Sequence, residues 1–207
     1  MDRYHDGQRE FQDRFDTRRL ADRLAEATSD TFGETLTAFV EARDMFFIAT
    51  TDAEGFPDCS YKGGDPGFVQ VVDDNTIVFP AFDGNGMFLT LGNMSVNPHV
   101  GLLFIDFETG NRLRVNGDAS IDPDDPLAAT YQGALCVVRV RARSIFANCK
   151  RYIHRYEKVA PSPFVPRDDV DPPVPDWKLD GWFEGTLSAD DPALDPTRPI
   201  VPAMPQF

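Results

Sequence analysis

The sequence contains few cysteines and few histidines, and this scarcity excludes several kinds of site. Among its 207 residues, these two types are limited to Cys59, Cys136, Cys149, His5, His99 and His154. An odd number of widely spaced cysteines predicts neither a disulfide framework nor a CxxC metal clip. We expect Cys59 and Cys149 to be small buried residues in a reducing environment. The scattered histidines lack HxxxH or HExxH spacing, so they do not indicate a zinc site.

Long apolar runs and surplus positive charge are also missing. No apolar segment approaches the roughly 18 residues needed to span a bilayer, and residues 1–16 are charged, unlike a secretory signal. The formal net charge is −14, which would repel nucleic acids and anionic membranes. We therefore expect a cytoplasmic protein that acts on a small molecule, with neither nucleic acid nor membrane as a partner.

Positive charge gathers in one stretch, residues 134–158, where seven lysines and arginines stand against the single acid Glu157. A local positive patch in an acidic protein suits a small anion better than a polyanion. Within it, Arg139, Arg141 and Arg143 alternate along one strand face, which favours ion pairing with the acidic remainder.

Short apolar segments joined by tight turns dominate the middle of the chain. Period-two patterns predict strands over residues 45–51, 57–62, 68–72, 76–80, 99–107, 112–121 and 135–146. Helical spacing predicts two helices within residues 17–43 and further helical segments over 87–96 and 151–159. Many short strands connected by hairpins are typical of an antiparallel barrel.

Composition divides the chain into three regions. Residues 1–43 form a helical N-terminal flank, and residues 44–160 form the β domain. Residues 161–207 hold 11 of the 17 prolines, so we expect no regular secondary structure there. They also hold both tryptophans, Trp177 and Trp182. Because free linkers are poor in aromatic residues, we expect an extended arm that packs on the barrel or on a partner subunit.

Two segments could bind an anion. Along residues 57–62, alternation places Ser60 and Lys62 on one strand face, offering a hydroxyl and a point charge. The alternative is an exposed lysine on an edge strand. Residues 83–86 read Asp-Gly-Asn-Gly before a predicted helix, so backbone N–H groups and the helix N-terminus could face a phosphate. The alternative is an ordinary turn.

Three segments carry a family resemblance: ATTDAEGFPDCSYKGG (residues 49–64), NPHVGLLFID (97–106) and RLRVNG (112–117). Over residues 34–158 the chain resembles the pyridoxamine 5'-phosphate oxidase-like, FMN-binding split-barrel family. The resemblance implies a mainly β fold, an antiparallel split β-barrel. It also implies an FMN-dependent oxidoreductase of unknown substrate, and a homodimer with the flavin at the subunit interface.

The resemblance also implies a set of cofactor-binding residues. They are Ser60, Tyr61, Lys62, Phe79, Pro80, Asn85, Gly86, Arg112, Arg151 and Tyr152. The family's cationic Ser-Arg-Lys stretch is replaced here by Asn85 and Gly86. The countercharge for a phosphate must then come from Lys62, Arg112 or Arg151, although Arg112 could equally belong to a solvated barrel face. We expect Trp177 or Trp182 to cover the open face of the flavin.

Three other functions stay open at this stage. Related barrels use a deazaflavin in place of FMN, so a deazaflavin-dependent reductase is one alternative. A flavin-binding or storage protein without turnover is the second, and a cofactor-free structural barrel is the third. The family's C-terminal Arg-Leu-x-Pro motif has no counterpart here, so vitamin B6 is not implied as the substrate. No catalytic residue and no metal ligand can be assigned.

Overall fold

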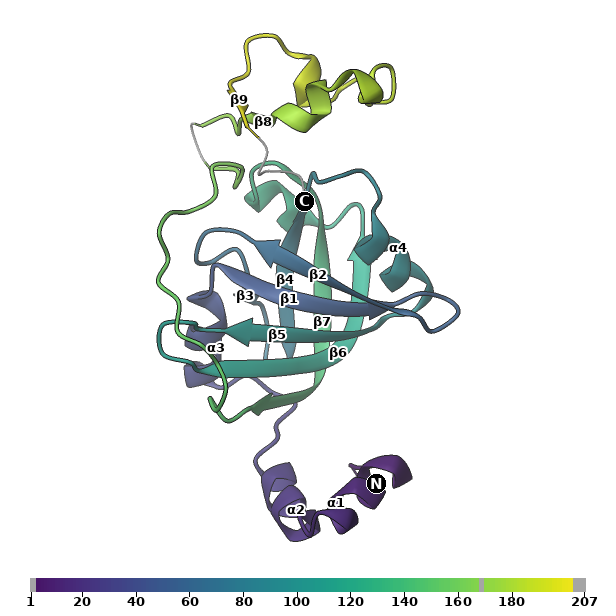
Figure 1. The fold of residues 1–207 in the computed structure, drawn as a ribbon, viewed down its shortest axis with the longest axis vertical. Coiled ribbons are helices and arrows are strands. Elements are labelled where there is room, and N and C mark those ends of the chain that lie inside the picture. The colour runs from purple at the N-terminus through teal and green to yellow at the C-terminus, as the bar shows by residue number, and fades with distance from the viewer. Residues whose placement is uncertain (1–2, 168–169, 203–207) are drawn as a thin grey trace.

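The protein is built around one curved antiparallel sheet (Figure 1). The computed structural model describes residues 3–167 and 170–202. The strands are β1 (Met45–Thr51), β2 (Pro57–Gly63), β3 (Gln70–Val71), β4 (Thr76–Phe82), β5 (His99–Ile105), β6 (Arg112–Asp122) and β7 (Ala134–Ala147). Their order is β2-β1-β5-β6-β7-β4-β3. Within the described residues no ladder joins the edge strands β2 and β3, so the fold is a split barrel, as predicted.

Alternation along the strands places the core on the concave side of the sheet. In β1, Phe46, Ile48 and Thr50 are buried, whereas their neighbours are exposed or half-buried. The Phe46 ring lies 5.0 Å from the Phe79 ring and 5.1 Å from the Phe104 ring, measured between centroids. Phe46, Phe79 and Phe104 are each at most 1% exposed and therefore form the aromatic centre of the core cluster.

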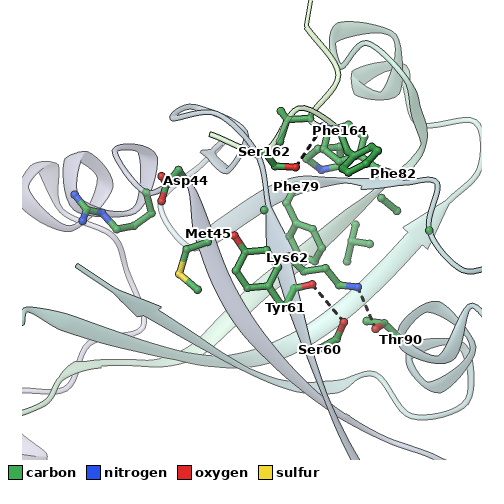
Figure 2. A pocket seen from close by; sticks show the side chains of 18 of the residues that line it. Asp44, Met45, Ser60, Tyr61, Lys62, Phe79, Phe82, Thr90, Ser162 and Phe164 are labelled. Carbon is green, nitrogen blue, oxygen red and sulfur yellow. Dashed lines mark hydrogen bonds between the residues drawn. The ribbon is translucent and has the colours of Figure 1, made fainter. Parts of the chain in front are cut away.

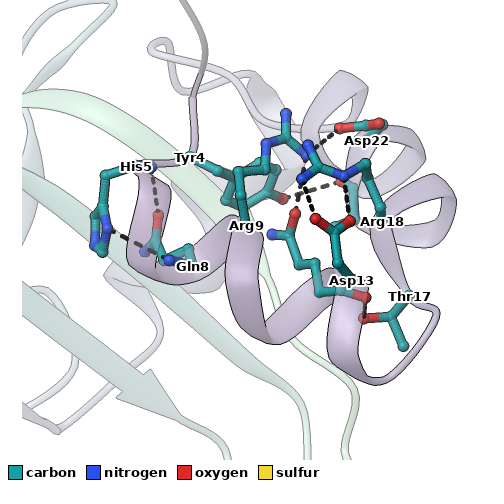
Figure 3. A network of polar contacts seen from close by, with 10 residues as sticks. Tyr4, His5, Gln8, Arg9, Asp13, Thr17, Arg18 and Asp22 are labelled. Carbon is teal, nitrogen blue, oxygen red and sulfur yellow. Dashed lines mark hydrogen bonds and ion pairs between the residues drawn. The ribbon is translucent and has the colours of Figure 1, made fainter.

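Three helices precede the sheet: α1 (Asp6–Arg14), α2 (Arg18–Glu26) and α3 (Glu34–Glu41). The first two form a hairpin that projects away from the barrel (Figure 1). Ion pairs hold them together: Arg9 lies 2.7 Å from Asp22, and Arg18 lies 2.5 Å from Asp13 (Figure 3). The sequence patterns did not predict α1, whose start is a reciprocal cap between His5 and Gln8.

The predicted helix over residues 151–159 is wrong. This segment has no regular secondary structure, and Tyr152 has a φ of 69°, which is incompatible with a right-handed helix. Long-range contacts hold the chain in an extended form instead. The Tyr156 N–H donates to the carbonyl of Phe107 at 3.2 Å, and the two rings pack edge to face.

The proline-rich arm contains more order than its composition predicted. Its two-residue strands β8 (Val174–Pro175) and β9 (Ile200–Val201) pair in parallel. Three short 3₁₀ helices lie between them: η2 (Asp176–Leu179), η3 (Gly181–Phe183) and η4 (Pro192–Leu194). In Figure 1 these elements gather into a small unit beyond one end of the barrel.

The exposure of the cysteine thiols differs from the prediction. Cys59 and Cys149 are exposed, contrary to expectation, and only Cys136 of the three thiols is buried. Both exposed thiols lie where strand alternation or a loop turns them outward. In the part of the chain that the structure describes, no helix is long and apolar enough to cross a bilayer.

Candidate functional site

The edge strand β2 turns polar side chains toward the barrel interior. In its ladder with β1, Lys62 lies opposite Phe46 and Ser60 lies opposite Ile48. Directly opposed residues share a sheet face, so Lys62 and Ser60 are on the face of the core. Tyr61 is on the other face and is exposed. An inward-facing lysine on an edge strand is unusual for a purely structural barrel and indicates a site.

A cavity of ≈ 980 Å³ opens beside β2 (Figure 2). It is lined by β2, by the end of β4 and the loop at residues 83–88, by the start of helix α4 (Leu89–Val96), and by residues 156–165. Its volume is at the upper end of the range typical of small-molecule and cofactor sites.

Lys62 is the central polar group of this cavity. Its Nζ lies 3.2 Å from the Thr90 Oγ1, and the Thr90 side chain is buried (Figure 2). Burial lowers the pKa of Lys62, and the nearby Asp58 carboxylate only partly opposes this effect. Burial disfavours the charged form of the Lys62 ammonium, and a bound anion would stabilise that form. The half-buried ammonium therefore favours the binding of an anion.

The other cations that line the cavity are paired. Arg43 lies 3.2 Å from Asp106, and Lys158 lies 2.5 Å from Asp44. Among the described lining residues, Lys62 is therefore the lysine or arginine without an ion pair to a carboxylate. Its charge is available to a ligand.

Helix α4 brings its N-terminus to the same cavity. The residue before it, Phe88, has a left-handed φ of 51°, and no side chain caps the first turn. The loop is closed by Asn85, whose Oδ1 accepts from the Met87 N–H at 3.1 Å. The helix is fastened to β1 because Asn93 donates to the Thr50 hydroxyl at 3.0 Å. Uncapped N–H groups at a fixed helix N-terminus form a second feature that attracts anions.

Residues 156–167, here called the strap, run along the cavity, and several residues between 156 and 165 line it. Lys158 ties the strap to Asp44, which precedes β1. Further along, Arg167 binds the two oxygens of Asp65 at 2.6 and 2.8 Å. Between these anchors, Phe164 lines the cavity (Figure 2). The strap therefore supplies an aromatic wall that the sequence did not predict.

The Arg167 anchor gives a testable prediction. We expect Arg167→Met to change global stability little, because the pair is partly exposed and screened by solvent. The strap should nevertheless loosen, which limited proteolysis would detect as faster cleavage within residues 156–167. The Arg167 guanidinium lowers the pKa of Asp65, so in the unmodified protein this protection should be lost as pH falls through that depressed value. Unchanged cleavage would contradict the anchoring role.

The structure gathers most of the predicted site residues into this one cavity. Those that line it are Ser60, Tyr61, Lys62, Phe79, Pro80, Asn85 and Gly86. Phe79 is 1% exposed, so it contributes the inner wall as a member of the core. Sequence reasoning missed Thr90 and Phe164. Thr90 lies in the first turn of the predicted helix and could have been found there, whereas nothing local identified Phe164.

The remaining predicted residues do not line the cavity of their own chain. Arg112 is on the outer face of β6, where its guanidinium donates to the Cys149 carbonyl at 2.8 and 3.1 Å. Arg151 lies 6.0 Å from the ring of Tyr152, which is 87% exposed. The indoles expected to cover a flavin are also absent from the lining residues that the structure describes.

Comparison with known proteins identifies the family. No curated protein matches the sequence. The solved structure of HupZ from Group A Streptococcus is 17% identical over 61% of this chain and 100% of its own, with a TM-score of 0.48. HutZ, the heme storage protein from Vibrio cholerae, is 22% identical over 52% and 88%, with a TM-score of 0.39. An F420 reductase is 18% identical over 58% and 100%, with a TM-score of 0.43. The pyridoxamine 5'-phosphate oxidase family profile matches residues 32–161, more than half of the sequence, so the chain belongs to this family.

Proposed function

We propose that the chain binds FMN in the cavity beside β2 and acts as a flavin-dependent oxidoreductase on a small molecule. The observation that carries the proposal is Lys62, a half-buried cation that faces the first turn of α4 and has no ion-pair partner among the described residues. An unpaired cation and an uncapped helix N-terminus converging on one cavity are the features that a phosphate-bearing ligand needs.

The walls of the cavity suit the rest of a flavin. Phe79, Pro80 and Phe82 line one side, and Phe164 from the strap lies near Phe82 in Figure 2. Apolar and aromatic walls with a few convergent polar groups are typical of sites that bind a flat organic cofactor. Ser60 adds a hydroxyl on the Lys62 face of β2. The residues present therefore fit a flavin with a single anionic group.

When bound, FMN supplies the transfer of a hydride or an electron pair. The residues of this chain then bind and orient it. Lys62 would hold the negative charge of the cofactor, and Thr90 fixes the Lys62 ammonium through their contact of 3.2 Å. Phe164 and the strap limit the access of water. A cation close to the ring or phosphate would also stabilise the negative charge of the reduced flavin.

The proposal includes a homodimer with two such sites. Exposed apolar side chains surround the mouth of the cavity: Tyr61, Met87, Phe88 and Leu89 are each at least half exposed. A cluster of this kind supports a protein interface. Arg112 and Arg151, which lie outside the cavity of their own chain, could then approach the flavin of the second copy and add positive charge.

Titration of the purified protein with FMN, followed by absorbance between about 300 and 550 nm, tests the proposal. We expect saturable binding at one flavin per chain, with the bands of free flavin shifted on entry to the apolar cavity. Reduction of the bound flavin by NADH or NADPH would distinguish an enzyme from a storage protein. Failure to bind FMN would reject the proposal, and binding of a deazaflavin instead would assign the site to that cofactor.

A further inference from the structure

Among the described residues of the C-terminal arm, Lys178 is the most deeply buried charged group. Its side chain is 6% exposed, and its Nζ lies 2.7 Å from Asp83 and 2.9 Å from Asp191. Asp191 also belongs to the arm, where it caps η4 by accepting from the Ala193 N–H. Burial opposes the charge on Lys178, but the two carboxylates outweigh it and raise the pKa of Lys178 above its ordinary value. Lys178 is therefore a fixed positive charge.

The contact with Asp83 joins the arm to the proposed flavin site. Asp83 directly follows β4, begins the Asp-Gly-Asn-Gly loop and lines the cavity. Its side chain is 52% exposed. A free carboxylate at this position would repel a phosphate bound at the neighbouring N-terminus of α4. The ammonium of Lys178 opposes that repulsion from the side of the arm.

We propose that Lys178 is a positioning residue of the flavin site, which holds the Asp83 carboxylate in an ion pair and so allows the loop to accept a phosphate. The inference rests on the proposed function. It makes the C-terminal arm part of the cofactor site, although its tryptophans do not line the cavity. It also explains how a loop without lysine or arginine can accept a phosphate group next to an acidic residue.

Comparison of FMN with riboflavin isolates this effect, because the two ligands differ only in the phosphate. The measured quantity is the ratio of the dissociation constant for FMN to that for riboflavin. In Lys178→Met we expect this ratio to rise about tenfold, since an unpaired carboxylate then faces the phosphate. In the double variant Lys178→Met with Asp83→Asn, the ratio should return to within about twofold of the unmodified protein, because the Asp83 carboxylate that lines the cavity is then absent. Asp191 loses its pair with Lys178 in both the single and the double variant, so it does not account for a difference between them.

Two further variants control for a purely structural role. Asp191→Asn disturbs the same buried cluster but keeps the pair between Lys178 and Asp83, so the ratio should not change. Asp83→Asn alone keeps Lys178 beside Asp191 and does not depend on the folding of Lys178→Met. Its ratio should not exceed that of the unmodified protein.

The outcomes separate the inference from the proposal on which it rests. Unmodified protein that binds neither flavin would reject the proposed function and, with it, the inference. Unmodified protein that binds FMN, combined with an unchanged ratio in Lys178→Met or equal losses for both flavins in all variants, would overturn the inference alone. A higher ratio in Asp83→Asn would also overturn it, because that variant has no carboxylate to repel the phosphate.

Discussion

Replacing Lys62 with methionine is expected to weaken FMN binding by about 10- to 100-fold. The substitution keeps most of the apolar stem and removes the ammonium, which in the described part of the chain is the lining cation without an ion pair. A hydrogen bond to a charged group contributes about 1.5–3 kcal/mol, and each 1.4 kcal/mol corresponds to about a tenfold change in affinity. Fluorescence or absorbance titration with FMN would measure the change.

The same substitution should leave the ligand-free protein at least as stable as before. Burial lowers the pKa of Lys62 below its ordinary value of 10.5, so the folded state binds the proton less tightly than the unfolded state does. The destabilisation is present below the folded pKa and is relieved as pH rises through that value toward 10.5. Removing the charge also removes this destabilisation. We expect an unchanged or higher melting temperature at neutral pH, and in the unmodified protein a loss of FMN affinity as Lys62 deprotonates.

Lys158→Met is the matched control. Lys158 also lines the cavity, but its charge is already paired with Asp44 at 2.5 Å. Its loss should therefore reduce FMN affinity less than about threefold, the effect of a partly exposed pair. Equal losses in the two variants would indicate a general electrostatic attraction. A lower melting temperature in Lys62→Met than in the unmodified protein would contradict the assignment of Lys62 to ligand binding.

The parts of this fold that the sequence predicts are those governed by local periodicity. The strand predicted over residues 45–51 matches β1, and alternation in residues 57–62 correctly separates the faces of Ser60 and Tyr61. The glycine-containing loop before α4 is predicted for a similar reason, because the preference of its residues for a turn depends only on the local sequence. Helix α4 starts two residues later than predicted, since Phe88 adopts a left-handed conformation.

The parts that the sequence does not predict depend on contacts between distant residues. The segment at residues 151–159 has helical spacing, yet its fold is determined by the contacts of Tyr156 with Phe107 and of Lys158 with Asp44. The pair between Lys178 and Asp83 joins residues 95 positions apart. Neither partner carries a local signal of the other. The strap, which lines the cavity, and the contact of the arm with Asp83 therefore follow only from the structure.

Replacing Phe46 with alanine is expected to cause the largest loss of stability. Phe46 is fully buried and its ring packs against Phe68, Phe79 and Phe104. Truncation of a buried phenylalanine costs about 3–5 kcal/mol, because it removes apolar contact and leaves a cavity. For a chain of this size, that corresponds to a melting temperature lower by about 10 °C. Differential scanning calorimetry would measure it.

Phe47→Ala is the control on the opposite face of the same strand. Phe47 is only half-buried, and its ring contacts Tyr61 at 6.0 Å between centroids. We expect a loss of about 1 kcal/mol, typical of a partly exposed position. Similar losses in the two variants would contradict the assignment of the concave face as the core.

The Phe46 variant also tests how the cavity is supported. Phe46 lies opposite Lys62 in the ladder and packs against Phe79, which forms the inner wall of the cavity. The flavin site and the core therefore share this wall, and a void beneath it should let Phe79 and Lys62 shift. We expect FMN affinity to fall in Phe46→Ala even at temperatures where the variant is fully folded, and to be retained in Phe47→Ala. Retained affinity in a folded Phe46→Ala protein would show that the wall does not depend on the core for its position.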